Sequence, residues 1–508
     1  MNHFLTEDTL RTGLTSYLKK WKYNNTVQDD LWESLTEAAH RQASLDPAIT
    51  AKEIMDTWTL QKGFPVVHVE RNYDTNEPTA TFTQAKFRLI KNESLPQGEY
   101  STYKWWIPVS YASINFNTDF SRTKPFFWIK PSDKAVTKPI IANEQDWLIV
   151  NVQETGFYRV NYDLKNWAML INQLRLNASA IHPINRGQLM DDALNLAKAS
   201  LLPYDLALEV TQYLKNEEEY LPWECFFTQF HFISTMMSKS SSYGTFKKYI
   251  QNLVHKEYTR LGYGQNEADP LPRRLHRTNV VTWACKVGHE GCLASTTTLF
   301  SEWMNSSSPN MDNPIPTNLR EVTYCTAIKM GGEKEWDFLW ERYLDGNVAY
   351  LTWSITENSG IRKQDTPLVL RSVAATSVGG YLTFNFVRDK WAKLEKFLGD
   401  IYQPALVHIV QAIAARLNTR FELHEMQQLR DRYDGELGAA TRAVDQGIET
   451  TMIQIQWMEE KLSTNRTGTD GPGSVPVYTE NRTEPKLLLP VRFRFQVFEN
   501  RTEPAGSG

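Results

Sequence analysis

The sequence has no apolar stretch long enough to cross a membrane. None of its hydrophobic runs approaches the ~20 residues that span a bilayer, and the first 25 residues alternate polar and apolar positions, unlike a secretory signal. Charge of one sign is not in excess either: 55 basic and 59 acidic side chains leave a formal net charge of −4, without a long basic run. We therefore expect no nucleic-acid partner and no membrane insertion through these residues.

Signatures of several enzyme classes are also missing. There is no Gly-x-Ser-x-Gly elbow, no Walker-type loop and no Gly-x-Gly-x-x-Gly fingerprint. Gly331-Gly332 is followed by Glu333, whose charge would repel a phosphate, so a turn between helices is the better interpretation. The sequence therefore contains no recognisable nucleophile elbow and no phosphate-binding loop.

A zinc hydrolase needs two histidines one helical turn apart, so that both imidazoles face the metal, with a glutamate between them to activate water. In His424-Glu425-Met-Gln-Gln428 a glutamine stands where the second ligand should be, and we interpret this segment as a solvated helix face. In His289-Glu290-Gly-Cys292 the cysteine has the wrong spacing to share a helix face, which indicates a loop. We therefore assign no catalytic residue and no metal ligand to this chain.

Cysteine is scarce, with 4 in 508 residues. Cys285 and Cys292 bracket six residues that include two glycines, a spacing that can close a small disulfide loop between two helices. In a reducing cell both would be ordinary buried thiols. We predict the disulfide, which leaves Cys225 and Cys325 without an obvious partner.

Asn-x-Ser/Thr sequons are frequent and would matter only in a secretory compartment. Their density favours a secreted or cell-surface ancestry, so we interpret the missing signal as truncation rather than cytosolic residence. The candidate glycosylation sites are Asn24, Asn92, Asn177, Asn305, Asn465, Asn481 and Asn500.

The composition is that of a folded chain: 41% of residues are hydrophobic and 22% charged, and the length suggests about three domains. Apolar positions from Leu5 to Trp21 recur at helical spacing, and a second helix is expected through Leu31, Leu35 and Ala39. A third opens at Thr50, where Glu53 completes a capping box. Residues 1–60 are therefore predicted to be helical.

The pattern then changes to short β-rich runs separated by turn residues. They predict a small β-sandwich over residues 63–163, followed by helices over 164–462 that stack as a curved array of the ARM or HEAT kind. Residues 463–508 are predicted to be a flexible tail. The fold class is thus mixed and mainly α, with strands expected at Val66–Val69, Lys86–Ile90, Trp105–Val109, Phe126–Ile129 and Trp147–Val152.

Five stretches, in this order along the chain, carry a family resemblance: Trp58–Val66, Gly156–Asp163, Ile184–Ala193, Gly331–Phe338 and Ile361–Asp365. They resemble aminopeptidase N and its relatives, a membrane-anchored family of zinc exopeptidases. The resemblance covers about residues 1–462. It implies that residues 1–60 are the last helices of a catalytic domain, followed by the β-sandwich and the C-terminal helical domain.

What this family uses for catalysis is not in this sequence. Its Gly-x-Met-Glu-Asn motif holds the substrate amine, its HExxH and a downstream Glu hold zinc, and a Tyr stabilises the tetrahedral intermediate. All of these would precede the point that matches Met1. The resemblance thus implies zinc, a membrane anchor and peptide substrates for the complete protein only, at the plasma membrane or secreted. No cofactor is expected in this chain, and its own localisation stays open.

We therefore predict a fragment of a zinc aminopeptidase that removes N-terminal residues from peptides. This fragment would supply the β-sandwich and a helical chamber that gates substrate, and would be inactive alone. The alternatives are a glycosylated binding or receptor module, or a truncated product that associates with a full-length subunit. A homodimer through the helical domain would also fit such a broad surface.

Between Tyr343 and Ile361 the sequence is shorter than in the family, which carries more helix there and a cysteine that would pair with the one matching Cys325. We expect low stability near residues 325–365, because neighbouring helices lose packing surface. Hydrogen exchange should show weaker amide protection there than in the flanking helices. Equal protection would contradict the expected deletion.

Overall fold

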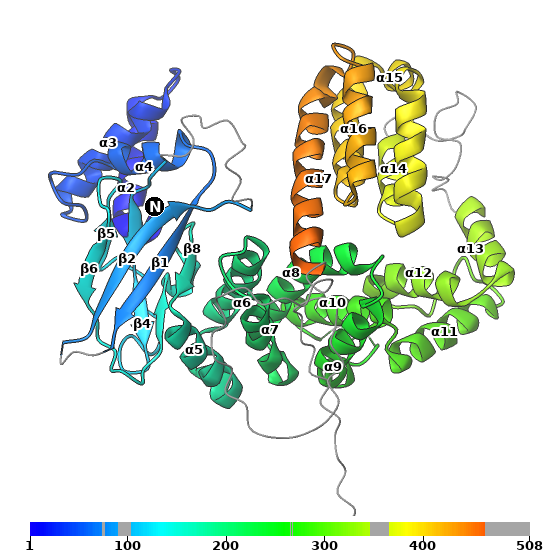
Figure 1. Ribbon diagram of the computed structural model, residues 1–508, viewed down its shortest axis with the longest axis horizontal. Helices are drawn as coiled ribbons and strands as arrows, with labels where there is room; N and C mark the ends of the chain where they lie inside the picture. The colour runs from blue at the N-terminus through cyan, green and yellow to red at the C-terminus, as the bar shows by residue number, and fades with distance from the viewer. Residues whose placement is uncertain (74–76, 90–102, 265, 267, 346–364, 463–508) are drawn as a thin grey trace, which may run out of the picture. The chain divides into compact units, whose positions relative to one another are not determined.

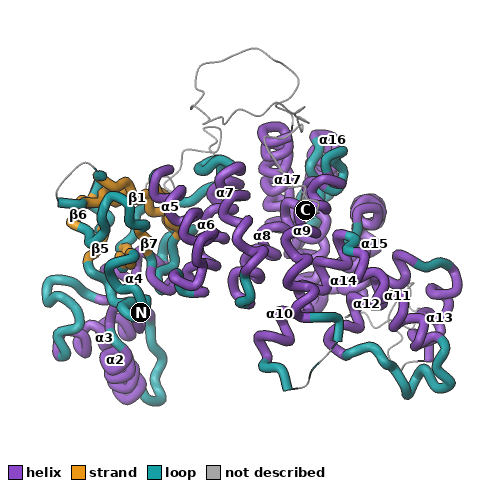
Figure 2. The backbone as a smooth tube through the Cα atoms, turned by 90° about the horizontal axis from the view of Figure 1, so that it is seen from below, coloured by secondary structure: helices purple, strands orange, loops and turns teal. Residues whose placement is uncertain are grey.

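A computed structural model describes residues 1–73, 77–89, 103–264, 266, 268–345 and 365–462 (Figure 1). It separates into two compact units, Met1–Phe226 and the residues from Phe227 onward. The described strands all belong to the first unit, whereas the second is helical (Figure 2). The predicted fold class, mixed and mainly α with a small β region, is confirmed. The predicted tail, 463–508, lies outside the described residues.

Helices open the first unit, as the sequence predicts. The capping box at the start of the fourth is present: Thr50 Oγ1 accepts from the Glu53 N–H at 3.1 Å, and Glu53 Oε2 accepts from the Thr50 N–H at 3.2 Å. The predicted helix over 5–21 is instead broken at Thr6, whose φ of 78° is left-handed. The elements are α1 (Asn2–Leu5), α2 (Glu7–Lys20), α3 (Gln28–Arg41) and α4 (Ala51–Thr59).

The packed face of α2 differs from the apolar stripe seen in the sequence. Leu14 and Leu18 on that stripe are exposed, and α2 instead buries Thr9 and Gly13 against α3. A Cβ built on Gly13 would lie 2.7 Å from Leu35 Cδ2 and 3.1 Å from Leu35 Cα. The two helices therefore approach through small side chains, which period alone does not reveal.

The strands form a four-stranded sheet and two short pairs. The large sheet has the order β6-β2-β1-β8, in which β1 runs antiparallel to β2 and parallel to β8. The pairs are β3 with β5 and β4 with β7. The bounds are β1 (Pro65–Asn72), β2 (Thr79–Lys86), β3 (Ile107–Val109), β4 (Tyr111–Ser113), β5 (Phe127–Ile129), β6 (Val136–Pro139), β7 (Leu148–Val150) and β8 (Arg159–Tyr162).

The strand predicted at Lys86–Ile90 is wrong, because β2 ends at Lys86 and occupies the residues before it. Thr79–Lys86 alternates buried and half-buried positions, but its inward side chains include the polar Gln84. Gln84 is satisfied inside the protein: its Nε2 donates to the Trp105 carbonyl at 2.9 Å, and its Oε1 accepts from the Trp105 N–H at 2.8 Å. The buried Gln84 interrupts the apolar alternation by which a strand is recognised, so the sequence pattern did not predict β2.

Helices follow β8. Asp163 caps α5 by accepting from the Asn166 N–H at 2.8 Å. Among the described helices, none combines the length and the apolar character that a membrane span needs. The element type changes after Thr59 and Tyr162, next to the predicted boundaries; the domains themselves stay predictions. The helices are α5 (Leu164–Asn177), α6 (Pro183–Lys198), α7 (Tyr204–Thr211), α8 (Tyr220–Met237), α9 (Tyr243–Leu261), α10 (Leu271–Val287), α11 (Glu290–Met304), α12 (Arg320–Met330), α13 (Glu333–Asp345), α14 (Thr366–Ala374), α15 (Ser377–Ala414), α16 (Arg420–Arg432) and α17 (Thr441–Leu462).

Helices of the second unit pack mainly against their neighbours in sequence, as in a stacked array. One core joins α14 to α17 around Trp391, Ile409 and Val444. A smaller aromatic core joins α11, α12 and α13 around Phe300 and Trp303. Local packing of this kind places each core within a short stretch of sequence.

Gly13→Ala should weaken the contact between α2 and α3. Alanine gains about 1 kcal/mol of helix propensity, yet its Cβ would overlap Leu35, and overpacking costs about 1–3 kcal/mol. Hydrogen exchange of α3 amides should therefore be faster in the variant. Gly244→Ala in α9 is the matched control, since a Cβ there meets nothing within 4 Å; α9 protection should be unchanged or higher. Unaltered α3 exchange in Gly13→Ala would show that Leu35 yields without cost.

Candidate functional site

The first candidate zinc segment, on α16, holds a single imidazole. His424 Nε2 lies 2.9 Å from Gln428 Nε2, and both side chains are exposed. Glu425 points elsewhere and forms an ion pair with Arg388 of α15. Its carboxylate is therefore engaged by a guanidinium and is not placed to act on a water beside His424.

The second candidate segment lies at the corner between α10 and α11. His289 is the N-cap residue of α11, so it does not share a helix face with Cys292 as a ligand pair would. Cys285 and Cys292 form a disulfide with a Cα–Cα distance of 5.2 Å, which removes the Cys292 thiolate as a ligand. Among the described residues, no group of three or more His, Cys, Asp or Glu side chains could hold a metal ion.

The two other cysteines are free thiols in different surroundings. Cys225 is half-buried on α8, with its Sγ 3.2 Å from a Cβ built on Gly187. Burial, with several nearby carboxylates, raises the pKa of Cys225 to about 12, so this thiol is unreactive at neutral pH. Cys325 is exposed on α12.

Three of the candidate glycosylation sites are exposed: Asn24, Asn177 and Asn305. Asn177 Oδ1 accepts from the Ser179 N–H at 3.2 Å and from its hydroxyl at 2.6 Å, within the same sequon. The other sites lie outside the described residues: Asn92, Asn465, Asn481 and Asn500.

Polar groups gather around Arg159 on β8, where three of the quoted stretches meet. Arg159 pairs with Asp191 and, at 3.1 Å, with Asp192, both on α6. Its guanidinium also lies 5.7 Å from the ring centroid of Phe64 and 5.2 Å from that of Phe87. Burial lowers the pKa of Arg159, but the two carboxylates outweigh burial and the net shift is upward.

Asp192 is the buried member of this cluster and joins α6 to the edge of the sheet. Its Oδ2 accepts from the Val160 N–H at 3.0 Å and from Gln188 Nε2 at 3.4 Å. Burial raises the pKa of Asp192 and the neighbouring Asp191 charge adds to this shift, while Arg159 and the Val160 N–H oppose it. Arg159, the Val160 N–H and Gln188 all donate to it, so the geometry favours the ionised carboxylate and holds it in place.

A strained turn leads into β8 beside this cluster. Asn151, Gln153 and Glu154 have φ values of 68°, 52° and 50°, a left-handed region unusual for these side chains. Asn151 Oδ1 accepts from the Gly156 N–H at 2.8 Å, and Asn185 Oδ1 of α6 accepts from the Gln153 N–H at 2.8 Å. The surrounding hydrogen bonds therefore hold the strain in place.

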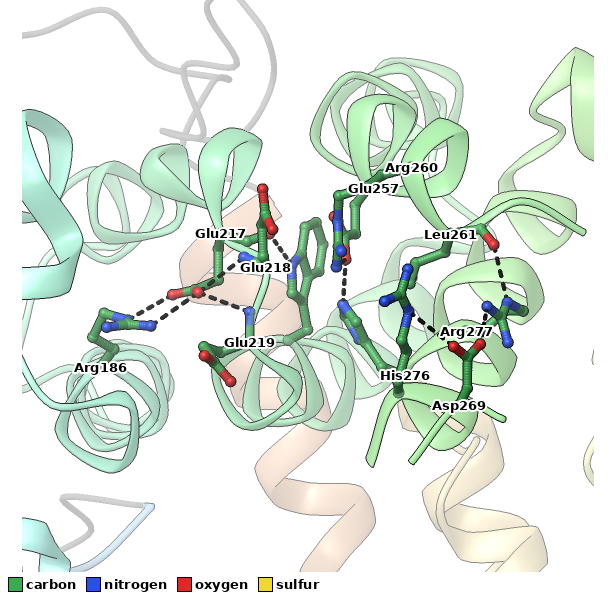
Figure 3. Close-up of polar contacts among 12 residues, drawn as sticks. Arg186, Glu217, Glu218, Glu219, Glu257, Arg260, Leu261, Asp269, His276 and Arg277 are labelled. Atoms are coloured by element: carbon green, nitrogen blue, oxygen red, sulfur yellow. Dashed lines mark hydrogen bonds and ion pairs between the residues drawn. The ribbon is translucent and has the colours of Figure 1, made fainter. Parts of the chain in front are cut away.

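A second buried ion pair in the first unit joins α6 to the segment before α8. Arg186 Nε donates to Glu217 Oε2 at 2.7 Å, and Arg186 Nη2 donates to Glu217 Oε1 at 3.0 Å (Figure 3). The two side chains are only 6% and 3% exposed. Arg186 Nη1 also donates to the Ile181 carbonyl, and Glu217 also accepts from the N–H groups of Glu218 and Glu219.

The second unit has its own buried network, also drawn in Figure 3. Glu257 on α9 contacts His276 Nε2 of α10 at 2.7 Å and accepts from Arg260 Nε at 2.7 Å. Burial would raise the pKa of Glu257, but the hydrogen bonds from Arg260 and His276 outweigh it and the pKa is lowered. Arg277 donates to Asp269 at 2.6 Å and to the Leu261 carbonyl at 3.0 Å.

These clusters share one property: their charged groups bond to one another and to the backbone across element boundaries. Sequence reasoning missed these residues as a set. Arg159, Arg186 and Asp192 lie inside two of the quoted stretches, whereas Glu217 lies outside all of them. The available signal was the charge of Arg159, Arg186 and Asp192 within stretches that also supply buried apolar side chains. Their geometry fits the joining of elements, since each carboxylate already has donors.

Comparison with known proteins places two families along the chain. The Peptidase family M1 domain matches residues 1–58, and the ERAP1-like C-terminal domain matches residues 147–453. Aminopeptidase Ey of Gallus gallus is 34% identical over 488 residues, which is 91% of this chain and 48% of that protein. Aminopeptidase N of Bos taurus is 33% identical over 487 residues, 91% of this chain and 49% of that protein.

The thyrotropin-releasing hormone-degrading ectoenzyme of Rattus norvegicus is 30% identical over 489 residues, 90% of this chain and 44% of that protein. The chain thus spans about half the length of the relatives it matches. The matched segment of the Peptidase family M1 domain coincides with α1–α4, and the second match begins just before β7.

Arg186→Met should destabilise α6 strongly, because it leaves Glu217 buried without its cation, at a cost of about 3–5 kcal/mol. Adding Glu217→Gln should recover most of this loss, since no buried charge then remains. Hydrogen exchange of α6 amides measures both effects. Lys165→Met, which breaks the exposed Lys165–Glu144 pair (43% and 57% exposed), is the control and should cost less than about 1 kcal/mol. Equal costs for Arg186→Met and Lys165→Met would contradict a structural role for the buried pair.

Proposed function

We propose that this chain, which belongs to the family of ERAP1-like C-terminal domains, is the scaffold and substrate-gating part of an aminopeptidase N-like metallopeptidase. The complete protein would remove N-terminal residues from peptides with a zinc-activated water. The observation that carries the proposal is the paired match, a segment of the Peptidase family M1 domain followed by an ERAP1-like C-terminal domain in one chain.

The contacts of the peptidase-family segment support a scaffold role. Trp58 Nε1 at the end of α4 donates to the Trp106 carbonyl at 3.0 Å, and Thr57 Oγ1 accepts from the Trp106 N–H at 3.2 Å. Gln61 Nε2 donates to the Lys104 carbonyl at 2.8 Å. Together with the shared core around Trp32 and Trp106, these bonds fix the helical segment to the strands that follow.

Zinc chemistry does not fit the candidate residues of this chain. A catalytic zinc site needs three protein ligands and an open position for water. The α16 segment supplies one imidazole at His424, and Glu425 is paired with Arg388. We therefore propose that the chain does not catalyse hydrolysis by itself, and that peptides are substrates only of the complete protein.

We place the complete protein at the cell surface or in the secreted fraction. The disulfide between Cys285 and Cys292 is favoured in oxidising compartments. The exposed sequons at Asn24, Asn177 and Asn305 are accessible for glycosylation.

A second candidate function is association with another subunit through the helical region, including a homodimer. Large apolar side chains of the second unit support it: Leu368, Leu382 and Phe421 are 62%, 61% and 70% exposed on α14, α15 and α16. A pull-down with a full-length enzyme and sedimentation of the chain alone distinguish subunit association from the scaffold role.

Purified chain should hydrolyse an alanine anilide no faster than buffer, and should hold no stoichiometric zinc. The reason is that neither a Lewis acid nor an anchor for the free amine is assembled from the candidate residues. A complete family member assayed in parallel, with and without chelator, is the positive control. Chelator-sensitive hydrolysis together with about one zinc per chain would contradict the proposal.

A further inference from the structure

Three hydrogen bonds join α9 to the corner between α10 and α11 in the second unit. Gln251 Nε2 donates to the Val287 carbonyl at 2.8 Å, and His255 Nδ1 lies 2.9 Å from His289 Nε2. Tyr258 and Ser295 hydroxyls are 3.5 Å apart. Gln251, His255 and Tyr258 are spaced four and three residues apart, so they lie on one face of α9. The imidazole pair is the middle bond of this row.

His289 is held in a fixed place, whereas His255 is exposed. The His289 ring packs on Tyr258 with centroids 4.6 Å apart, and Gly291 leaves room for it: a Cβ there would lie 3.3 Å from His289 Cε1. The disulfide closes the corner that carries His289. His289 Nδ1 is buried without a hydrogen-bond partner.

The buried Nδ1 decides which tautomer of His289 is stable. A buried N–H without an acceptor is costlier than a buried acceptor without a donor. Neutral His289 therefore carries its proton on Nε2 and donates it to His255 Nδ1. Protonation of either ring disturbs this arrangement: His289 would bury an unpaired Nδ1–H, and His255 would face one N–H with another.

We propose that the His255–His289 pair is an acid-sensitive latch that holds α9 to the disulfide corner while both rings are neutral. It rests on this geometry alone and is independent of the proposed function. Protonation of the pair would release the contact, and α9 would open locally from the α10–α11 corner.

The surrounding charges give the direction of the pH response. Burial first, and then His255, lowers the pKa of His289, against the opposing charge of Glu290. On α9, Lys256 and Glu257 follow His255 in the sequence, and the Glu257 carboxylate is bonded to Arg260 and His276. Because the pKa of His289 is lower folded than unfolded, where it is about 6.5, the contribution is full above that pH and is lost as pH falls below it.

The test is hydrogen exchange of α9 and α10–α11 peptides in the full chain at pH 7.5 and 5.5, corrected for intrinsic exchange. Opening of α9 from the corner should increase at pH 5.5, by up to about tenfold, because an opened imidazole of ordinary pKa binds a proton that the closed His289 resists. His289→Asn should abolish the increase, and asparagine is a good N-cap, so α11 should stay folded. His255→Asn, which keeps an acceptor for His289, should reduce it.

His408→Asn is the matched control, since His408 is an exposed histidine of α15 that contacts Gln411; it should keep the full wild-type response. An increase under about twofold in the wild-type chain would overturn the latch. So would an increase of the same size in His289→Asn as in the wild type.

Discussion

The pairing of Arg159 with Asp192 is the constraint on which the first unit depends. β8 is an edge strand, bonded on one side to β1, and an edge leaves backbone donors that must be satisfied. Asp192 meets this need from α6 by accepting the Val160 N–H, while Arg159 of the same strand balances its charge. One carboxylate thus satisfies a backbone donor on the open side of β8 and fixes α6 onto the sheet.

The other buried ion pairs follow the same logic. A buried pair costs desolvation that its attraction barely repays, so it adds little net stability compared with apolar packing. The pair does destabilise any other packing of the helices, because a displaced Arg186 or Glu257 would lose several hydrogen bonds at once. We infer that these pairs fix which helices meet, while apolar cores such as that around Trp391 supply most of the stabilisation.

Much of the fold could be predicted from the sequence, and the predictions that were wrong have physical causes. Capping chemistry is local, so Thr50 and Glu53 located the start of α4. β2 was missed because its inward face includes Gln84, whose bonds to Trp105 are made across the fold. The buried face of α2 was misjudged because Gly13 packs by its smallness, which a hydrophobic period does not register.

In the candidate site, too, local spacing could be predicted from the sequence, whereas contacts between distant residues could not. Spacing alone excluded a second imidazole opposite His424, whereas the pairing of Glu425 with Arg388 depends on α15 and was invisible in the motif. Catalytic carboxylates must be left free to accept a proton or a metal, at a cost in stability. Asp192, Glu217, Glu257 and Glu425 are instead each held by a cation. Side chains used in this way give a rigid framework, and a framework can position a reaction whose reacting groups come from another part of the protein.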